Sequence, residues 1–138
     1  MATIPESHVD LLTGPVYLAV ATVNADGQPQ VTPMWGSYDG SNILLNTVRG
    51  RKKERNMVER PMVTVLAIDP ANPYRWIQVQ GSVEMTEDGA RAQIDELAKL
   101  YRGVDSYYGG VQPAEAEGKE TRVTAKLAPK TVVVFPPA

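Results

Sequence analysis

Short apolar segments alternate with turn residues along most of the chain. Residues 16–23 are apolar on both faces, which predicts a central strand. Turn residues at 24–27 and 39–41 separate it from two further predicted strands, over 30–38 and 42–48. These connections are too short for the crossovers that parallel strands require. The first third of the chain therefore predicts antiparallel strands.

The pattern continues in the second half, where four more strands are predicted at 62–68, 74–85, 122–127 and 131–135. Within 74–85 the residues alternate, so Ile77 and Val79 share one face while Trp76 and Gln78 share the other. Six or seven antiparallel strands joined in this way tend to curl and close into a barrel, which hides their edges. We therefore expect a mainly β fold in a single domain over residues 1–138.

Helical signals are confined to three segments. Residues 5–12 predict a short opening helix, and residues 49–60 a short, largely exposed helix that ends before Pro61. Residues 87–102 carry an apolar stripe at helical spacing, with Gly103 as a suitable stop. The polar, Gly-rich residues 104–120 follow, and we expect them to form a mobile loop.

Composition narrows the classes of chemistry. The chain has 138 residues, no Cys, one His and a net charge of −2. Thiolate chemistry, a His-based metal site and a Ser-His-Asp triad are therefore disfavoured, and no metal is expected. The sequence contains no apolar run long enough for a membrane span and no signal-peptide pattern, which favours a cytoplasmic protein.

The strongest chemical signal is a basic segment directly after the predicted strand 42–48. Five of the 14 Lys and Arg residues lie between Arg49 and Arg55, which leaves nine basic residues elsewhere against 16 acidic ones. A cationic spot on an acidic protein indicates a local anion receptor rather than a nucleic-acid surface. Asn46 and Thr47 add neutral hydrogen-bonding groups beside it. The alternative is a solvated, exposed loop without a ligand.

Aromatic residues supply a second signal. Trp76 lies on the polar face of its predicted strand, where it either packs against a helix or second subunit or stacks on a planar cofactor. Trp35 has the same two interpretations. Tyr107 and Tyr108 lie in the expected mobile loop, where their rings could contact a substrate. The carboxylates are scattered, so the sequence identifies no catalytic acid or base.

Four segments together resemble the split β-barrel superfamily of pyridoxamine 5′-phosphate oxidases, and most closely its branch that binds the deazaflavin coenzyme F420. They are 19–22 with 26–30, 45–47 with 51–56, Arg60-Pro61-Met62-Val63 and Trp76-Ile77-Gln78-Val79-Gln80-Gly81. The resemblance implies a homodimer with two cofactor sites between the subunits. It also implies cofactor contacts from Gln30, Asn46 and Thr47, phosphate contacts from Arg51 and Lys53, and contacts from the second subunit through Trp76, Gln78 and Val79.

The resemblance implies an F420-dependent oxidoreductase that transfers a hydride between the cofactor and a small organic substrate. Two alternatives stay open: an FMN-binding flavoprotein of the same fold, and a non-catalytic F420 carrier. The chain ends at Phe135-Pro136-Pro137-Ala138 without the substrate-phosphate residues of pyridoxamine phosphate oxidases. That departure disfavours vitamin B6 oxidation as the activity.

Overall fold

The computed structural model describes residues 2–138, in which seven strands form one antiparallel sheet. The strands are β1 (Leu18–Val23), β2 (Pro29–Met34), β3 (Gly36–Tyr38), β4 (Ile43–Val48), β5 (Met62–Asp69), β6 (Asn72–Thr86) and β7 (Arg122–Phe135). The α-helices are α1 (Asp10–Thr13), α2 (Lys52–Glu59) and α3 (Ala90–Arg102), and the short 3₁₀ helices are η1 (Glu6–His8) and η2 (Ala114–Lys119). The mainly β prediction is confirmed. The helices predicted at 49–60 and 87–102 occur with shorter bounds as α2 and α3, whereas the helix predicted at 5–12 is divided into η1 and α1.

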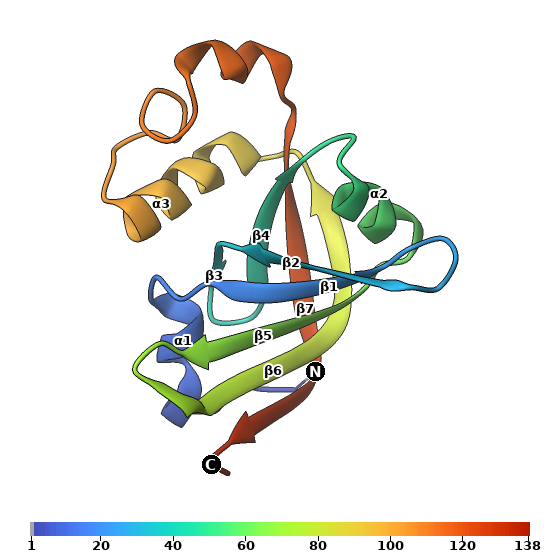
Figure 1. Cartoon of the computed structure of the whole chain (residues 1–138), viewed down its shortest axis with the longest axis vertical. Helices are drawn as coiled ribbons and strands as arrows, with labels where there is room; N and C mark the ends of the chain where they lie inside the picture. Colours follow the sequence, from blue (N-terminus) through green and yellow to red (C-terminus); the bar gives the residue numbers. More distant parts are fainter. Residues whose placement is uncertain (1) are drawn as a thin grey trace.

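The order of the strands explains why the sheet curls into a split barrel. The order is β2-β1-β5-β6-β7-β4-β3, which places β2 and β3 at opposite edges. Yet only Trp35 separates the end of β2 from the start of β3. The two edges must therefore approach each other, and the sheet bends around its own interior (Figure 1).

Two predicted strand boundaries were wrong. The strand expected over 30–38 is divided at Trp35 into β2 and β3, because the chain turns there from one sheet edge to the other. The strands expected at 122–127 and 131–135 are halves of one strand, β7. A register shift opposite Gln80 and Gly81 bends β6 and β7 together, so Pro129 lies within the paired strand instead of ending it.

The barrel interior is a mainly aliphatic core. We use the name barrel core for its largest fully buried side chains, which are Leu11, Leu12, Leu18, Val20, Ile43, Leu45, Met57, Val65, Ile77, Val79 and Leu127. Inward residues alternate with outward ones along β1 and β5, as expected for a sheet packed on one face. The barrel core thus fixes the positions of the strand ends that carry polar side chains.

A second core lies outside the barrel, between α3 and the chain that follows it. We call it the α3 cluster; its buried residues are Ile94, Leu97, Ala98, Tyr107 and Tyr108, with Trp35 and Tyr101 packed against them. Within residues 104–120, the predicted mobile loop, Tyr107 and Tyr108 are buried in this core, whereas residues 109–120 are mostly exposed. No apolar pattern predicts the burial of the two tyrosines, because Ser and Gly flank them.

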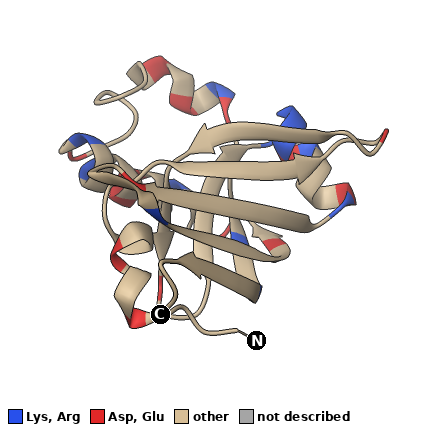
Figure 2. Cartoon of the chain, turned by 60° about the horizontal axis from the view of Figure 1, so that its bottom comes forward, with Lys and Arg blue, Asp and Glu red and all other residues tan. Residues whose placement is uncertain are grey.

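Charged residues are distributed unevenly among the secondary-structure elements. Figure 2 shows that they lie mostly in the helices and connecting segments, whereas the strands of the curled sheet are largely uncharged. No helix within residues 2–138 combines the length and apolar character that crossing a membrane requires.

Candidate functional site

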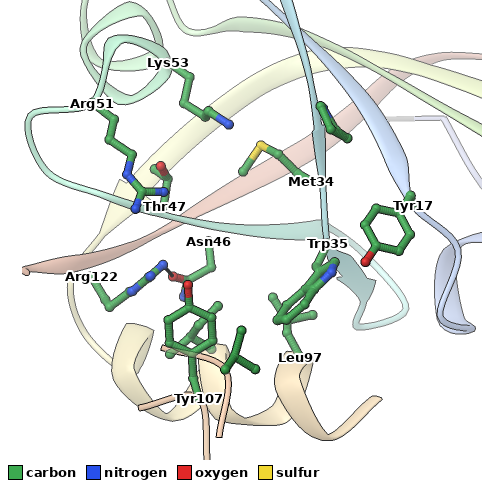
Figure 3. Close-up of a pocket in the computed structure, with 13 residues that line it drawn as sticks. Tyr17, Met34, Trp35, Asn46, Thr47, Arg51, Lys53, Leu97, Tyr107 and Arg122 are labelled. Carbon is green, nitrogen blue, oxygen red and sulfur yellow. Dashed lines mark hydrogen bonds between the residues drawn. The ribbon is translucent and has the colours of Figure 1, made fainter. Parts of the chain in front are cut away.

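A cavity of about 210 Å³ opens between the barrel and the α3 cluster. Strand β4 and the start of α2 form one wall, whereas α3 and the segment after it form the other. Figure 3 shows Arg51 and Lys53 pointing into one end of the cavity, and Trp35 and Tyr17 bounding the opposite end. The cavity therefore has a cationic end and an aromatic end.

Of the five cations in the basic segment, only Arg51 and Lys53 line this cavity. Arg49 is neutralised elsewhere, because it pairs with Glu54 at 3.0 Å and with Glu87 at 3.0 Å. Glu54 is buried and also accepts a hydrogen bond from the Gly50 N–H at 2.8 Å, which fixes the turn that leads into α2. Arg49 is thus held by two carboxylates outside the cavity, whereas Arg51, with Glu120 at 3.4 Å, lines the cavity together with Lys53.

Lys53 is the least compensated charge at the cationic end. Among residues 2–138, no carboxylate lies within ion-pair distance of its ammonium group. Burial, and secondarily the positive charge of Arg51, lowers the pKa of Lys53 from its usual value of 10.5. Beside it, the buried Thr47 hydroxyl has no hydrogen-bond partner in the described chain. Unpaired polar groups of this kind are costly unless a ligand satisfies them.

A polar network forms the floor of the cavity. Arg122 is buried and donates from Nη1 to Asn46 Oδ1 at 3.1 Å and from Nε to the Tyr108 hydroxyl at 3.0 Å. Asn46 in turn donates to the Ala90 carbonyl at 2.8 Å and to Gln93 Oε1 at 2.6 Å. These bonds connect β4 and β7 to the first turn of α3. They set the width of the cavity because they fix the distance between its two walls.

The aromatic end is built by stacked and edge-on rings. Trp35 stacks on Tyr101 with ring centroids 5.2 Å apart and an interplanar angle of 13°. Tyr107 meets Trp35 edge-on at 6.1 Å. The Tyr101 hydroxyl accepts from the Gly36 N–H at 3.1 Å and lies 2.7 Å from the Val16 carbonyl, to which it can donate. This wall is therefore rigid and apolar, which suits a flat ring system.

A polar brace attaches α2 to the barrel. Asn56 is buried and donates to the Thr22 hydroxyl at 3.1 Å and to Asn24 Oδ1 at 2.9 Å. Arg60 donates to the Val23 carbonyl at 2.7 Å and to Asn56 Oδ1 at 3.1 Å. The helix that presents Lys53 thus has a fixed position relative to β1.

The structure brings together most of the site residues that the sequence predicts. The predicted residues that line the cavity are Trp35, Asn46, Thr47, Arg51, Lys53 and Tyr107. Sequence reasoning missed Tyr17, Met34, Leu97 and Arg122, which also line it. Arg122 carried no local signal, since it stands alone at the start of a strand. Only the packing of β7 beside β4 places it near Asn46.

Other predicted site residues lie elsewhere in this chain. Gln30 accepts a hydrogen bond from the Thr22 hydroxyl at 3.2 Å and does not line the cavity. Trp76 and Gln78 line a separate hollow on the outer face of the sheet. The Val79 side chain is fully buried in the barrel core, so only its main chain could contact a ligand. Tyr108 lies behind the cavity wall, against Arg122.

Known families and solved structures match nearly the whole chain. The family described as pyridoxamine 5′-phosphate oxidase matches residues 4–134. A solved structure of an F420 reductase is 33% identical with a TM-score of 0.80, covering 94% of this chain and 98% of that one. A comparison with curated proteins gives no match.

Two more distant structures share the fold. A conserved hypothetical protein from Mycobacterium tuberculosis is 22% identical with a TM-score of 0.72, over 95% of this chain and 84% of that one. The General Stress Protein 26 from Bacillus anthracis is 17% identical with a TM-score of 0.67, over 96% and 94%.

Proposed function

The chain belongs to the pyridoxamine 5′-phosphate oxidase family, and from that premise we propose that it is an oxidoreductase that uses coenzyme F420. In this proposal the cofactor binds in the cavity between β4 and α3, and a small organic substrate binds beside it. The 33% identity to an F420 reductase over nearly the whole length of both chains supports the choice of cofactor.

The observation that carries the proposal is the pair of cations at one end of the cavity. Arg51 and Lys53 both line the cavity beside Thr47, and Lys53 has no carboxylate partner within residues 2–138. A phosphate group would accept hydrogen bonds from both cations. The aromatic end would then receive the flat ring, and these residue types therefore fit a deazaflavin.

The bound cofactor would supply the hydride chemistry, and the protein would supply its position. Arg51 and Lys53 would anchor the phosphate, while Asn46, whose amide group already donates to the Ala90 carbonyl and Gln93, would offer only Oδ1 to a polar edge of the ring. Trp35 and Tyr107 would exclude water and hold the substrate against the ring. Each of these roles is binding or orientation, which matches a chain in which no acid or base pair stands out.

We also propose that two copies of the chain complete each site. The cavity encloses about 210 Å³, below the roughly 300–1,000 Å³ of common ligand sites. The outer face of the sheet exposes apolar side chains, among them Val31, Met62, Ile68, Val133 and Phe135. Large exposed apolar faces are typical of subunit interfaces. A second copy on this face would bring its own Trp76 and Gln78 to the cofactor.

Light scattering tests the dimer. A complex of two chains with bound cofactor is expected at micromolar concentration. A 15.0 kDa monomer that still binds cofactor would contradict a site shared between subunits.

FMN is the second candidate cofactor. The matched family is described as an oxidase of pyridoxamine 5′-phosphate. Arg51 and Lys53 could bind the phosphate group of either cofactor. The carrier alternative uses the same cavity without turnover.

Two measurements distinguish these functions. A fluorescence titration compares the affinity of the purified protein for F420 with its affinity for FMN, and tighter binding of F420 is expected. Turnover of reduced F420 with a panel of enones and quinones then separates an enzyme from a carrier. Tighter binding of FMN would refute the proposed cofactor, whereas F420 binding without any turnover would refute the proposed activity.

A further inference from the structure

Glu120 lies between the two arginines that line the cavity. One carboxylate oxygen is 3.4 Å from Nη2 of Arg51, and the other is 3.4 Å from Nη2 of Arg122. The Tyr108 hydroxyl donates to the second oxygen at 2.7 Å, which fixes the orientation of the carboxylate. Glu120 is thus a counter-ion that both cavity arginines share.

Glu120 does not itself line the cavity. It lies behind Arg122, in a separate hollow that also contains Tyr108 and Arg91. Its influence on a ligand would therefore act through its charge rather than through contact. An anion on the free edge of the Arg51 guanidinium would lie within the Debye length of about 8 Å at physiological ionic strength. The Glu120 side chain is only 20% exposed, so solvent screens this repulsion incompletely.

We propose that Glu120 tunes which phosphate charge the site accepts, because its carboxylate lowers the affinity for a group with two negative charges more than the affinity for a group with one. The inference rests on the proposed function, in which the cavity binds a phosphate-bearing cofactor. Coulomb energy is proportional to the charge of the ligand. The repulsion from Glu120 is therefore about twice as large for a dianion as for a monoanion.

This difference separates the two candidate cofactors. Coenzyme F420 carries its phosphate as a phosphodiester with one negative charge. FMN carries a phosphomonoester, whose charge is about −1.5 to −2 at pH 7 because its second pKa is about 6. A fixed carboxylate beside Arg51 therefore penalises FMN more than F420. Glu120 would be a specificity-determining residue that acts at the phosphate rather than at the ring.

The test removes the charge of Glu120 and keeps its shape. Glu120→Gln retains an oxygen that accepts the Tyr108 hydroxyl bond, and changes the field at the cavity by one unit. Glu117→Gln is the matched control, because Glu117 pairs with Arg91 at 2.8 Å and does not line the cavity. Both variants change the net charge equally, and thermal unfolding verifies that each is folded.

Two ligands with the same ring but different phosphate charge show the effect of charge alone. FMN is compared with its 5′-methyl phosphodiester, which has the same ring and a single negative charge. Dissociation constants from fluorescence titration give the gain in affinity for each ligand. F420 is titrated in parallel, but the negatively charged tail beyond its phosphate makes it less suitable for the ratio.

Glu120→Gln is expected to raise the affinity for the methyl diester about threefold and that for FMN about tenfold, because the gain for a dianion approaches the square of the gain for a monoanion. Glu117→Gln is expected to change the affinity for either ligand by less than about twofold. Equal gains for both ligands, or no gain, would overturn the proposal. A loss of affinity in Glu120→Gln would also overturn it, since Glu120 would then serve to position Arg51.

The experiment distinguishes a failure of the Glu120 proposal from a failure of the proposed function. If F420 binds and turns over but Glu120→Gln leaves the ratio of the FMN and diester dissociation constants unchanged, only the role of Glu120 is wrong. If the ratio shifts as expected but F420 neither binds nor turns over, the proposed function is wrong and the role of Glu120 stands. If none of the three ligands binds to the wild-type protein, both proposals are wrong.

Discussion

The barrel core and the α3 cluster contain different kinds of side chain. The barrel core is aliphatic, and its largest side chains are less than 2% exposed. The α3 cluster is aromatic and borders polar groups, including Arg122 over the Tyr107 ring at 4.6 Å. The buried polar atoms without partners in the described chain lie where α3 meets the sheet, on Gln93 of α3, Thr47 of β4 and Thr124 of β7. An aliphatic core needs only volume to be filled, whereas an aromatic and polar one leaves directional groups available for a ligand.

The comparison predicts that binding and stability respond to different residues, and the largest effect should come from the cationic end. Arg51→Ala/Lys53→Ala removes two charge-assisted contacts to a phosphate, each contributing about 1.5–3 kcal/mol. Cofactor affinity should fall by a factor of about 100 or more, with the melting temperature nearly unchanged. Isothermal titration calorimetry measures the loss.

Lys52→Ala/Arg55→Ala is the matched control for that variant. Both residues are exposed on α2 and neither lines the cavity. The control removes the same charge and should weaken binding by less than about threefold, through long-range electrostatics alone. Equal losses in the two double variants would mean that the segment attracts anions only by its general charge.

A pair of leucines tests whether the cores are separable. Leu127→Ala and Leu97→Ala each empty a fully buried position, so each should lower the free energy of unfolding by about 2–5 kcal/mol. Leu97 also lines the cavity, whereas Leu127 does not. Only Leu97→Ala should therefore change the cofactor affinity of the folded protein. Urea unfolding measures the free energy of unfolding, and titration below the unfolding transition measures cofactor affinity. A change of affinity in Leu127→Ala would show that the two cores are not independent.

A substitution in the polar floor of the cavity should lower the free energy of unfolding by an intermediate amount. Asn46→Ala leaves Arg122, Gln93 and the Ala90 carbonyl each without one partner, at a cost of about 1–3 kcal/mol. Amide hydrogen exchange should accelerate in α3 before it accelerates in β5 and β6, because the lost bonds connect α3 to the sheet. Asn42→Ala, a half-buried position just before β4, is the control. Uniform acceleration across the sheet would show that the two cores open as one unit.

The smallest predicted effect is a pH dependence that originates at Lys53. Its pKa is lowered by burial and by Arg51, so it loses its charge at a lower pH than an ordinary lysine. Cofactor affinity should therefore fall severalfold as the pH rises toward the usual lysine pKa of 10.5. Stability should rise over the same range, because the unfolded chain binds the proton more tightly. Lys53→Arg keeps its charge, and a pH dependence that persists in this variant would assign the effect to another group.

The sequence by itself determined the strands, the barrel and the basic segment. Alternation over 74–85 predicted which residues face inward, and Ile77 and Val79 are indeed fully buried. These features are local, since period-two patterning and turn residues specify a strand without reference to its neighbours. The concentration of five cations in residues 49–55 was also visible as composition alone.

Only the tertiary structure decided which of those residues form the cavity. Arg49 and Arg51 look alike in the sequence, yet Glu87 and Glu54 neutralise the first while the second faces the cavity. Arg122 joins Asn46 across 76 positions of the chain because β7 pairs with β4. Residues 104–120 predict a mobile loop, and only the fold shows that Tyr107 and Tyr108 within it are buried against α3. Each of these outcomes depends on a partner far away in the sequence, and local patterns carry no information about such partners.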